Sequence, residues 1–219
     1  FQLNNSPLSA VTHLFIHVGL QHLFGNLVPL IAFGIVLELA LSGLELITLF
    51  FFAGVLSSAL FALITPGAGL LGASAAISGM MGAAMLLKPK QTILLLLVTP
   101  LLIYYVVYPA TAAVYSVRLE QVSVEEKQLE TKVTQLIREN KTVEAKQANA
   151  TLVQAQATKT QIVEGRKTEE KTPSTIIVHL IGAALGIAFI FGFKRKKIRE
   201  GMKEYDNAIG SVLKIFSRK

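Results

Sequence analysis

The chain has 219 residues, of which 52% are apolar, and its mean hydropathy is +0.54; with recurrent apolar stretches of spanning length, this composition is typical of a membrane protein. The chain has 21 Lys and Arg residues and 14 Asp and Glu residues, and its basic residues flank apolar stretches. The alternation of aromatic and basic residues that would indicate nucleic-acid binding is absent from the sequence. There is no cysteine, which excludes disulfides, thiolate metal sites and a cysteine nucleophile.

Two membrane spans are predicted first along the chain, at about 19–40 and 44–64, after a polar, then mildly amphipathic lead-in at 1–18. The Thr-Pro-Gly-Ala-Gly run at 65–69 cannot continue a helix. The next helix is expected to begin near Ser74 and to reach Lys88 after only about 21 Å, too short for an apolar core of about 30 Å. Its start must lie below the membrane surface, where irregular backbone needs protein cover or water. We therefore expect a water-accessible cavity around 67–78.

A fourth apolar segment is predicted at 92–115, bent by Pro100 and Pro109 and carrying a tyrosine belt for the outer interface. Residues 116–173 are rich in Glu, Lys, Gln, Thr and Ala, which predicts one long helix or a helical hairpin outside the bilayer. Its apolar residues follow a loose heptad-like spacing: Val122, Leu129, Val133, Leu136 and Val143. A last span is predicted at 176–193. A basic amphipathic helix follows on the cytoplasmic membrane surface, with apolar residues Met202, Tyr205, Ile209, Val212, Leu213 and Phe216.

Four segments are therefore expected: a membrane core at 1–115, an extramembrane insertion at 116–173, the last transmembrane helix at 174–193, and a cytoplasmic tail at 194–219. The basic clusters at 88–90 and 194–199 predict a cytoplasmic C-terminus and an external insertion, in a multi-pass protein of the cell membrane. In agreement, the three Asn-X-Ser/Thr sequons, at Asn4, Asn140 and Asn149, all fall in segments predicted to be external.

Four polar side chains are expected at one depth inside the membrane. Ser74 and His179 lie fourteen and fifteen residues before the next basic cluster, so both are about 21–23 Å from one face at 1.5 Å per residue. His22 and Asn26, four apart on one face of the first span, bracket that depth. A serine hydroxyl needs a base to become a nucleophile, and the resulting oxyanion needs preplaced donors in a low-dielectric site. These residues predict a serine protease that works within the bilayer.

The order and spacing of these residues match a known pattern. His13-x3-His17-x4-His22-x3-Asn26, then Glu38, Gly72-x-Ser74 and His179-x2-Gly182-x3-Gly186, closely resemble the rhomboid intramembrane serine proteases from about residue 11 to 193, apart from the insertion. The resemblance implies an all-α polytopic bundle of six helices. Five hydrophobic segments are found here, so we expect the family's first helix to be missing from this chain.

The resemblance also implies the chemistry of the site. Ser74 would be the nucleophile and His179 the base of a dyad, and His22, Asn26 and the backbone N–H of Ser74 would stabilise the oxyanion. The substrates would be transmembrane segments of membrane proteins, and no cofactor, metal ion or nucleic acid is implied. Two positions depart from the family pattern: Ala75 replaces a glycine, and Ser78 replaces an aromatic residue that often stacks on the histidine.

The insertion is far longer than the family's external loop and borders the helix thought to gate substrates, so we hypothesise that it influences substrate access or recruitment. One alternative function is a catalytically impaired rhomboid-like pseudoprotease that binds membrane clients. A second is a transporter or metal-handling protein that uses the histidines, but no intramembrane carboxylate pairs with them and Glu38 lies too near the cytoplasmic edge.

Each candidate residue also has a structural interpretation. Taken alone, Ser74 is compatible with helix packing, and His179 with a hydrogen-bonded polar group between helices. The two glycines after His179 indicate that its helix approaches the helix carrying Ser74. His13 and His17, four apart, have a spacing that metal ligands use, but we expect them to hydrogen-bond the lead-in and to have no catalytic role.

Overall fold

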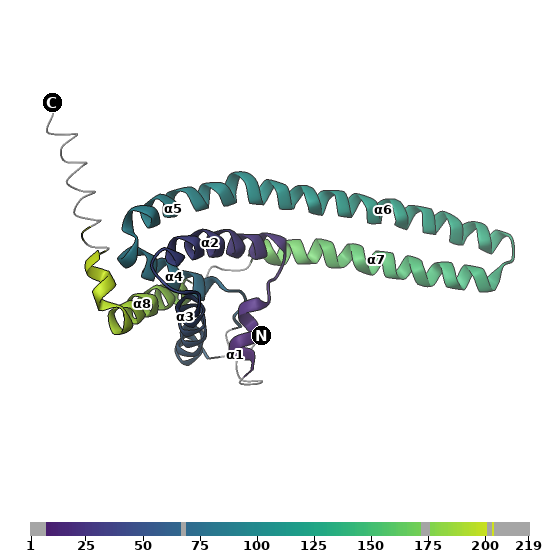
Figure 1. Ribbon diagram of the computed structural model, residues 1–219. Coiled ribbons are helices and arrows are strands. Elements are labelled where there is room, and N and C mark those ends of the chain that lie inside the picture. Colours follow the sequence, from purple (N-terminus) through teal and green to yellow (C-terminus); the bar gives the residue numbers. More distant parts are fainter. Residues whose placement is uncertain (1–7, 67–68, 172–175, 201–202, 204–219) are drawn as a thin grey trace, which may run out of the picture. The chain divides into compact units, whose positions relative to one another are not determined.

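The computed structural model describes residues 8–66, 69–171, 176–200 and Lys203. These residues form helices joined by short loops, without a β-strand among them, which confirms the predicted all-α fold class (Figure 1). The chain divides into two compact units, residues 1–105 with 173–219, and residues 106–172. The amphipathic helix predicted at 202–216 lies outside the described residues.

The first unit contains the apolar helices. A short helix α1 (Ser9–Thr12) and a 3-10 turn η2 (His13–Phe15) form the lead-in. The helices that follow are α2 (Leu20–Glu38), α3 (Gly43–Ile64), α4 (Ser74–Leu87), α5 (Pro89–Leu102) and α8 (Ile176–Phe193). By length and composition, α2, α3, α8 and the continuous helix Pro89–Arg138 are suited to cross a membrane, whereas α4 is shorter. As predicted, α4 begins at Ser74, and α8 has the predicted bounds.

Local chemistry explains where two of these helices begin. At the start of α3, the backbone N–H of Ser42 donates to Glu45 Oε2 at 2.8 Å, and the Ser42 side chain accepts a backbone N–H of the first turn, forming a capping box. Pro89 occupies the first turn of α5, where its missing N–H costs nothing.

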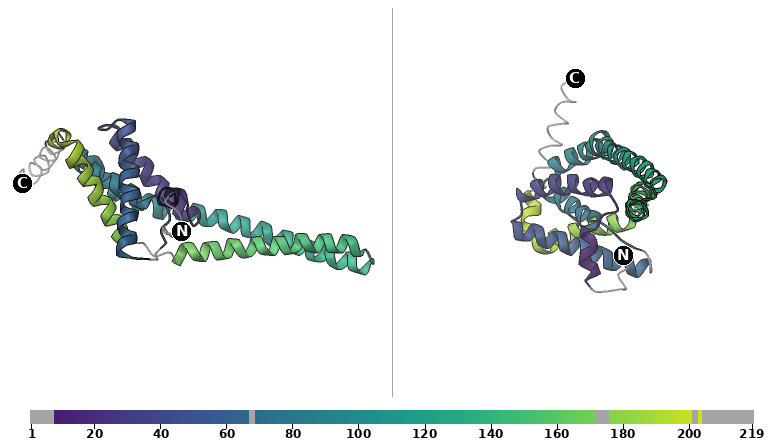
Figure 2. Two further views of the ribbon diagram at one scale, coloured as in Figure 1. Left: turned by 90° about the horizontal axis from the view of Figure 1, so that it is seen from below. Right: turned by 90° about the vertical axis from the view of Figure 1, so that its right-hand side faces the viewer.

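The core of the first unit lies where α2, α3, α4 and α8 meet. Its fully buried large side chains are Phe33, Leu37, Leu49, Met80 and Ile190, contributed by all four helices. At one end of the unit, Lys194, just after α8, pairs with Glu45 near the start of α3, and the Lys197 ammonium donates to the carbonyl of Ala40 just after α2. The ends of α2 and α8 therefore lie beside the start of α3, so that α3 runs opposite to both (Figures 1 and 2).

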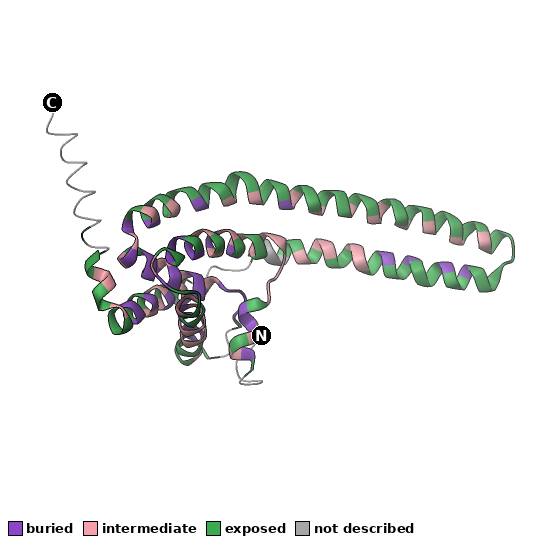
Figure 3. Ribbon diagram, in the orientation of Figure 1, coloured by how far each residue is buried: buried purple, intermediate pink, exposed green. Residues whose placement is uncertain are grey.

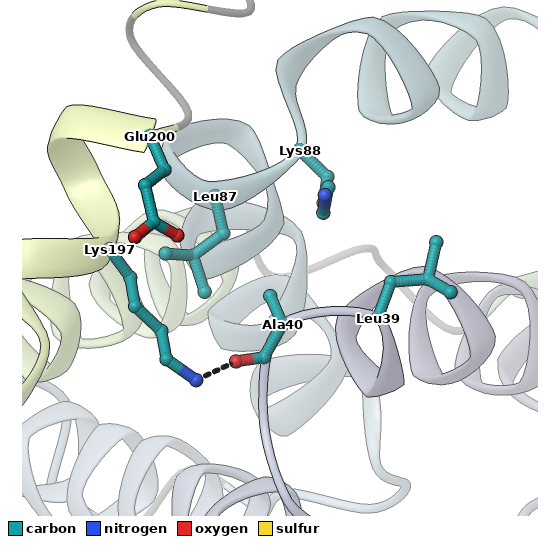
Figure 4. Close-up of a pocket in the computed structure, with 6 residues that line it drawn as sticks. All are labelled: Leu39, Ala40, Leu87, Lys88, Lys197 and Glu200. Carbon is teal, nitrogen blue, oxygen red and sulfur yellow. Dashed lines mark hydrogen bonds between the residues drawn. The ribbon is translucent and has the colours of Figure 1, made fainter.

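A pocket of about 140 Å³ opens at this same end of the unit, where α4 also ends (Figure 4). Its lining residues are Leu39, Ala40, Leu87, Lys88, Lys197 and Glu200. Both basic clusters of the sequence thus lie at one end of the helix bundle, and Ser74 lies at the opposite end of α4. The two basic clusters were predicted to lie on the same side of the membrane, and this requires them to be at the same end of the bundle.

The helix that begins at Pro89 does not stop at the predicted end of the fourth segment, near residue 115. It continues without a break to Arg138 through a π-helical segment, Ile103–Val107, and α6 (Tyr108–Arg138). The π-helical turn lies between Pro100 and Pro109, each of which removes a backbone donor.

The second unit is a helical hairpin, one of the two forms that the sequence allowed. α6 turns at Asn140, which has a φ of 57°, into α7 (Thr142–Lys171), and the two helices lie side by side (Figures 1 and 2). Most of their surface is exposed, and the buried residues of α7 follow a 3-4-3 spacing: Ala145, Ala148, Leu152 and Ala155 (Figure 3). Lys159 pairs with Glu126 at 2.6 Å. Val143, part of the predicted heptad, lies on α7 just after the turn and is 66% exposed.

Candidate functional site

Helices α4 and α8 approach so closely that only glycine fits at three positions between them, Gly82 on α4 and Gly182 and Gly186 on α8. A Cβ added to Gly182 would lie 2.2 Å from the carbonyl oxygen of Ala75, and one added to Gly186 would lie 1.9 Å from that of Gly79. The Gly182–Ala75 and Gly186–Gly79 pairs keep the same offset in sequence, so the helices run in the same direction, and the second turn of α8 lies beside the first turn of α4. This contact confirms the predicted approach of the α8 glycines to the helix that carries Ser74.

The start of α8 thereby lies beside the start of α4. Val178 is 3% exposed and packs in a small apolar cluster with Phe61, Leu70 and Ala75. His179, the next residue, lies one turn before Gly182 and therefore, by the same offset, at the level of Gly72, within one turn of Ser74. Both side chains are half-buried.

The hydrogen bonds of the described residues do not include one between the Ser74 hydroxyl and the His179 imidazole. Catalytic hydrogen bonds are often long in an enzyme without substrate and shorten when substrate binds. The Ser74–His179 dyad therefore stays a prediction, which rests on the common level of the two residues.

The backbone just before Ser74 forms a tight turn against α2. Gly72 has a φ of +90°, a conformation that favours glycine. A Cβ on Gly72 would lie 2.7 Å from His22 Nε2 and 3.3 Å from Asn26 Nδ2, so the imidazole and the amide both lie against this turn. The structure therefore brings His22 and Asn26 next to the peptide chain that leads into Ser74.

The hydrogen bonds of His22 and Asn26 make both side chains suitable donors. The backbone N–H of Val18 points to His22 Nδ1 at 3.5 Å, a long contact that favours the tautomer with the ring proton on Nε2, the atom nearest to the Gly72 turn. Asn26 is 6% exposed, and its Nδ2 donates one hydrogen to the His22 carbonyl at 2.8 Å and carries a second. An oxyanion site needs donors of this kind, held in place before the reaction.

The two lead-in histidines differ in their contacts. His13 is 3% exposed; its Nδ1 bonds the Ser9 carbonyl at 2.9 Å, which confirms the expected bond within the lead-in, and its Nε2 bonds Ser58 Oγ on α3 at 2.7 Å. The ring of His17 packs edge-on against that of His22 at 5.1 Å. Burial lowers the pKa of both His13 and His17 below 6.5. No cluster of three or more His, Asp or Glu side chains suited to a metal occurs among the described residues.

The contact between Ser58 and His13 was not identified from the sequence. Its only signal is a serine pair, Ser57-Ser58, inside an apolar helix, and such serines usually bond their own backbone, as both do here.

Both departures from the rhomboid pattern, Ala75 and Ser78, lie at the contact between α4 and α8. The Ala75 carbonyl faces Gly182, and Ser78, whose hydroxyl donates to the Ser74 carbonyl at 2.9 Å, has its Cβ 3.3 Å from a Cβ added there.

The N-terminal parts of α2, α4 and α8 thus carry the polar residues that the sequence singled out. A family described as "Rhomboid domain" matches residues 4–125, more than half of the chain, including His22, Asn26 and Ser74. Searches with this chain find no match among the curated proteins or the solved structures. With its several apolar helices of spanning length, the chain is a multi-pass membrane protein. It belongs to the rhomboid family.

Proposed function

We propose that the protein is a serine endopeptidase that cleaves transmembrane segments of other membrane proteins inside the bilayer. The observation that supports this most directly is the position of His22 and Asn26 against the Gly72 turn, immediately before Ser74. The rhomboid family is a family of intramembrane protease-like proteins, and its match covers this turn and α2. The approach of α8 to α4 adds His179 at the same level.

In the proposed reaction, Ser74 Oγ attacks the carbonyl carbon of a substrate peptide bond while the His179 imidazole takes the hydroxyl proton. The carbonyl oxygen becomes an oxyanion, which accepts hydrogen bonds from the Ser74 backbone N–H, His22 Nε2 and Asn26 Nδ2. When the carbon–nitrogen bond breaks, His179 gives its proton to the leaving amine. Water then hydrolyses the acyl-enzyme by the same proton transfers and releases Ser74.

The substrate must expose a peptide bond that a transmembrane helix normally hides. Substrates with glycine or proline near the cut should therefore be favoured, because these residues destabilise a helix by about 1–3 kcal/mol relative to alanine. We also propose that the end of the bundle with the basic clusters is cytoplasmic and that the hairpin is external. Ser74 would then lie on the external side of the bilayer centre.

The test of the proposed activity is cleavage of a transmembrane reporter by the protein in lipid vesicles. Ser74→Ala and His179→Ala should abolish cleavage without lowering the melting temperature by more than a few degrees. Ser57→Ala, which removes a buried hydroxyl elsewhere in the bundle, should cleave like the wild type. Cleavage by Ser74→Ala would end the assignment of the nucleophile. If a fluorophosphonate probe does not label the wild-type protein, the pseudoprotease that binds membrane clients is the better function.

The proposed orientation has an independent test, because the natural chain contains no cysteine. Single cysteines introduced at two exposed positions, Asn149→Cys on the hairpin and Lys196→Cys after α8, can be labelled in intact cells with a membrane-impermeant maleimide. We expect labelling at 149 only. Labelling at 196 from outside would reverse the orientation.

A further inference from the structure

The lead-in at 9–15 contacts both α3 and the turn that carries Ser74. On α3, a Cβ added to Gly54 would lie 3.0 Å from a methyl group of Leu14, which is fully buried. One helical turn later, Ser58 bonds His13. The lead-in is thus attached to one face of α3 at two successive turns, once by packing and once by a hydrogen bond.

The side chain of His13 is fixed at both ring nitrogens. The Ser9 carbonyl can only accept, so His13 Nδ1 carries the proton of a neutral ring. His13 Nε2 then accepts from the Ser58 hydroxyl at 2.7 Å. The single hydrogen of this hydroxyl also lies near the Gly54 carbonyl, at 2.8 Å. Loss of the Ser58 hydroxyl would leave a buried imidazole nitrogen without its donor, which is costly.

The backbone of His13 continues this chain of contacts to the candidate site. Its carbonyl oxygen accepts the backbone N–H of Gly72 at 2.9 Å. Gly72 is the residue whose left-handed conformation turns the chain into α4, and its Cα faces His22 and Asn26. A shift of His13 would therefore move the turn that sets the position of the Ser74 hydroxyl and N–H.

We infer that His13 and Ser58 are positioning residues, which hold the Gly72 turn so that Ser74 is presented to substrate and to the oxyanion donors. This inference rests on the proposed protease function, because it names residues that prepare the same site. In this inference, neither the His13 nor the Ser58 side chain touches the reacting atoms. Ser58 acts through His13, and His13 acts through its carbonyl bond to Gly72.

Two adjacent serines provide a matched pair of variants. Ser57 and Ser58 are both on α3, 0% and 1% exposed, and each hydroxyl oxygen lies within hydrogen-bond distance of the carbonyl four residues before it. The described contacts differ in that Ser58 also bonds His13. Ser57→Ala and Ser58→Ala therefore remove the same group from the same helix, and only the second breaks the connection to Gly72.

The experiment compares reporter cleavage by both variants with that of the wild type. We expect Ser58→Ala to lower kcat at least about tenfold with little change in KM, because a displacement of a reacting group by about 1 Å costs on the order of a hundredfold. Ser57→Ala should keep the wild-type kcat, and Ser58→Thr, which restores a hydroxyl, should recover part of the loss. Equal kcat values for the two alanine variants would overturn the inference.

A second measurement does not depend on catalysis. Amide hydrogen exchange of peptides that contain Gly72 should be faster in Ser58→Ala than in Ser57→Ala, since the Gly72 N–H loses a fixed acceptor. Equal exchange in the two variants would refute the connection between Ser58 and the turn. If the wild type neither cleaves nor reacts with a serine probe, the proposed function fails, whereas the exchange comparison still decides the connection.

Discussion

The contact between α4 and α8 predicts a large effect from one added methyl group. In Gly186→Ala, the new Cβ would lie 1.9 Å from the carbonyl oxygen, 2.6 Å from the carbonyl carbon and 2.8 Å from the Cα of Gly79. Ordinary contact begins at 3.4 Å, so the closest approach is about 1.5 Å too short. All three atoms belong to the backbone of a helix, which cannot rotate away as a side chain would. The two helices must separate.

The cost follows from that separation. Overpacking of this kind typically destabilises by about 1–3 kcal/mol, and the better helix propensity of alanine returns about 0.5–1 kcal/mol. For a chain of this length each kcal/mol lowers the melting temperature by about 2–4 °C. Activity should fall further than stability, because His179 lies on the displaced helix and a shift of about 1 Å in a reacting group costs about a hundredfold.

The matched control is Gly192→Ala, in the last turn of the same helix, where an added Cβ has no atom within 4 Å. Both variants would be measured in lipid vesicles, by thermal unfolding and by reporter cleavage. Gly186→Ala should lose several degrees and at least tenfold in cleavage, and Gly192→Ala should retain both. If the two variants behave alike, the close parallel approach of α4 and α8 is wrong.

Three further results are expected. Gly72→Ala should abolish cleavage, because a φ of +90° and His22 Nε2 at 2.7 Å both exclude a Cβ; wild-type cleavage would contradict the turn geometry. The melting temperature should fall as the pH drops below about 6.5, because burial lowers the pKa of His13 in the folded protein and the unfolded chain then binds more protons; a flat profile would contradict this. Glu45→Ala should destabilise by about 1 kcal/mol in thermal unfolding through loss of the Ser42 capping box and of the ion pair with Lys194, whereas an unchanged midpoint would mean that neither contact contributes to stability.

The predictions that the sequence supported well were those governed by local rules. The length of an apolar run sets a membrane span, so the bounds of α8 and the first residue of α4 were predicted correctly. The glycine spacing after His179 predicted the approach of α8 to α4. The match to the rhomboid domain agrees with the spacing of the histidines on the lead-in and α2.

Contacts between segments that are distant in sequence were decided only by the tertiary structure. The bond between His13 and Ser58 spans 45 positions, and no periodicity on α3 distinguishes Ser58 from Ser57. The choice of a hairpin for the insertion likewise depends on the fit of the α7 alanines against α6. Local pattern defines the length and the apolar face of a helix. The rotation and shift of one helix against another follow from how all the side chains pack at once, and those two quantities determine which polar atoms meet.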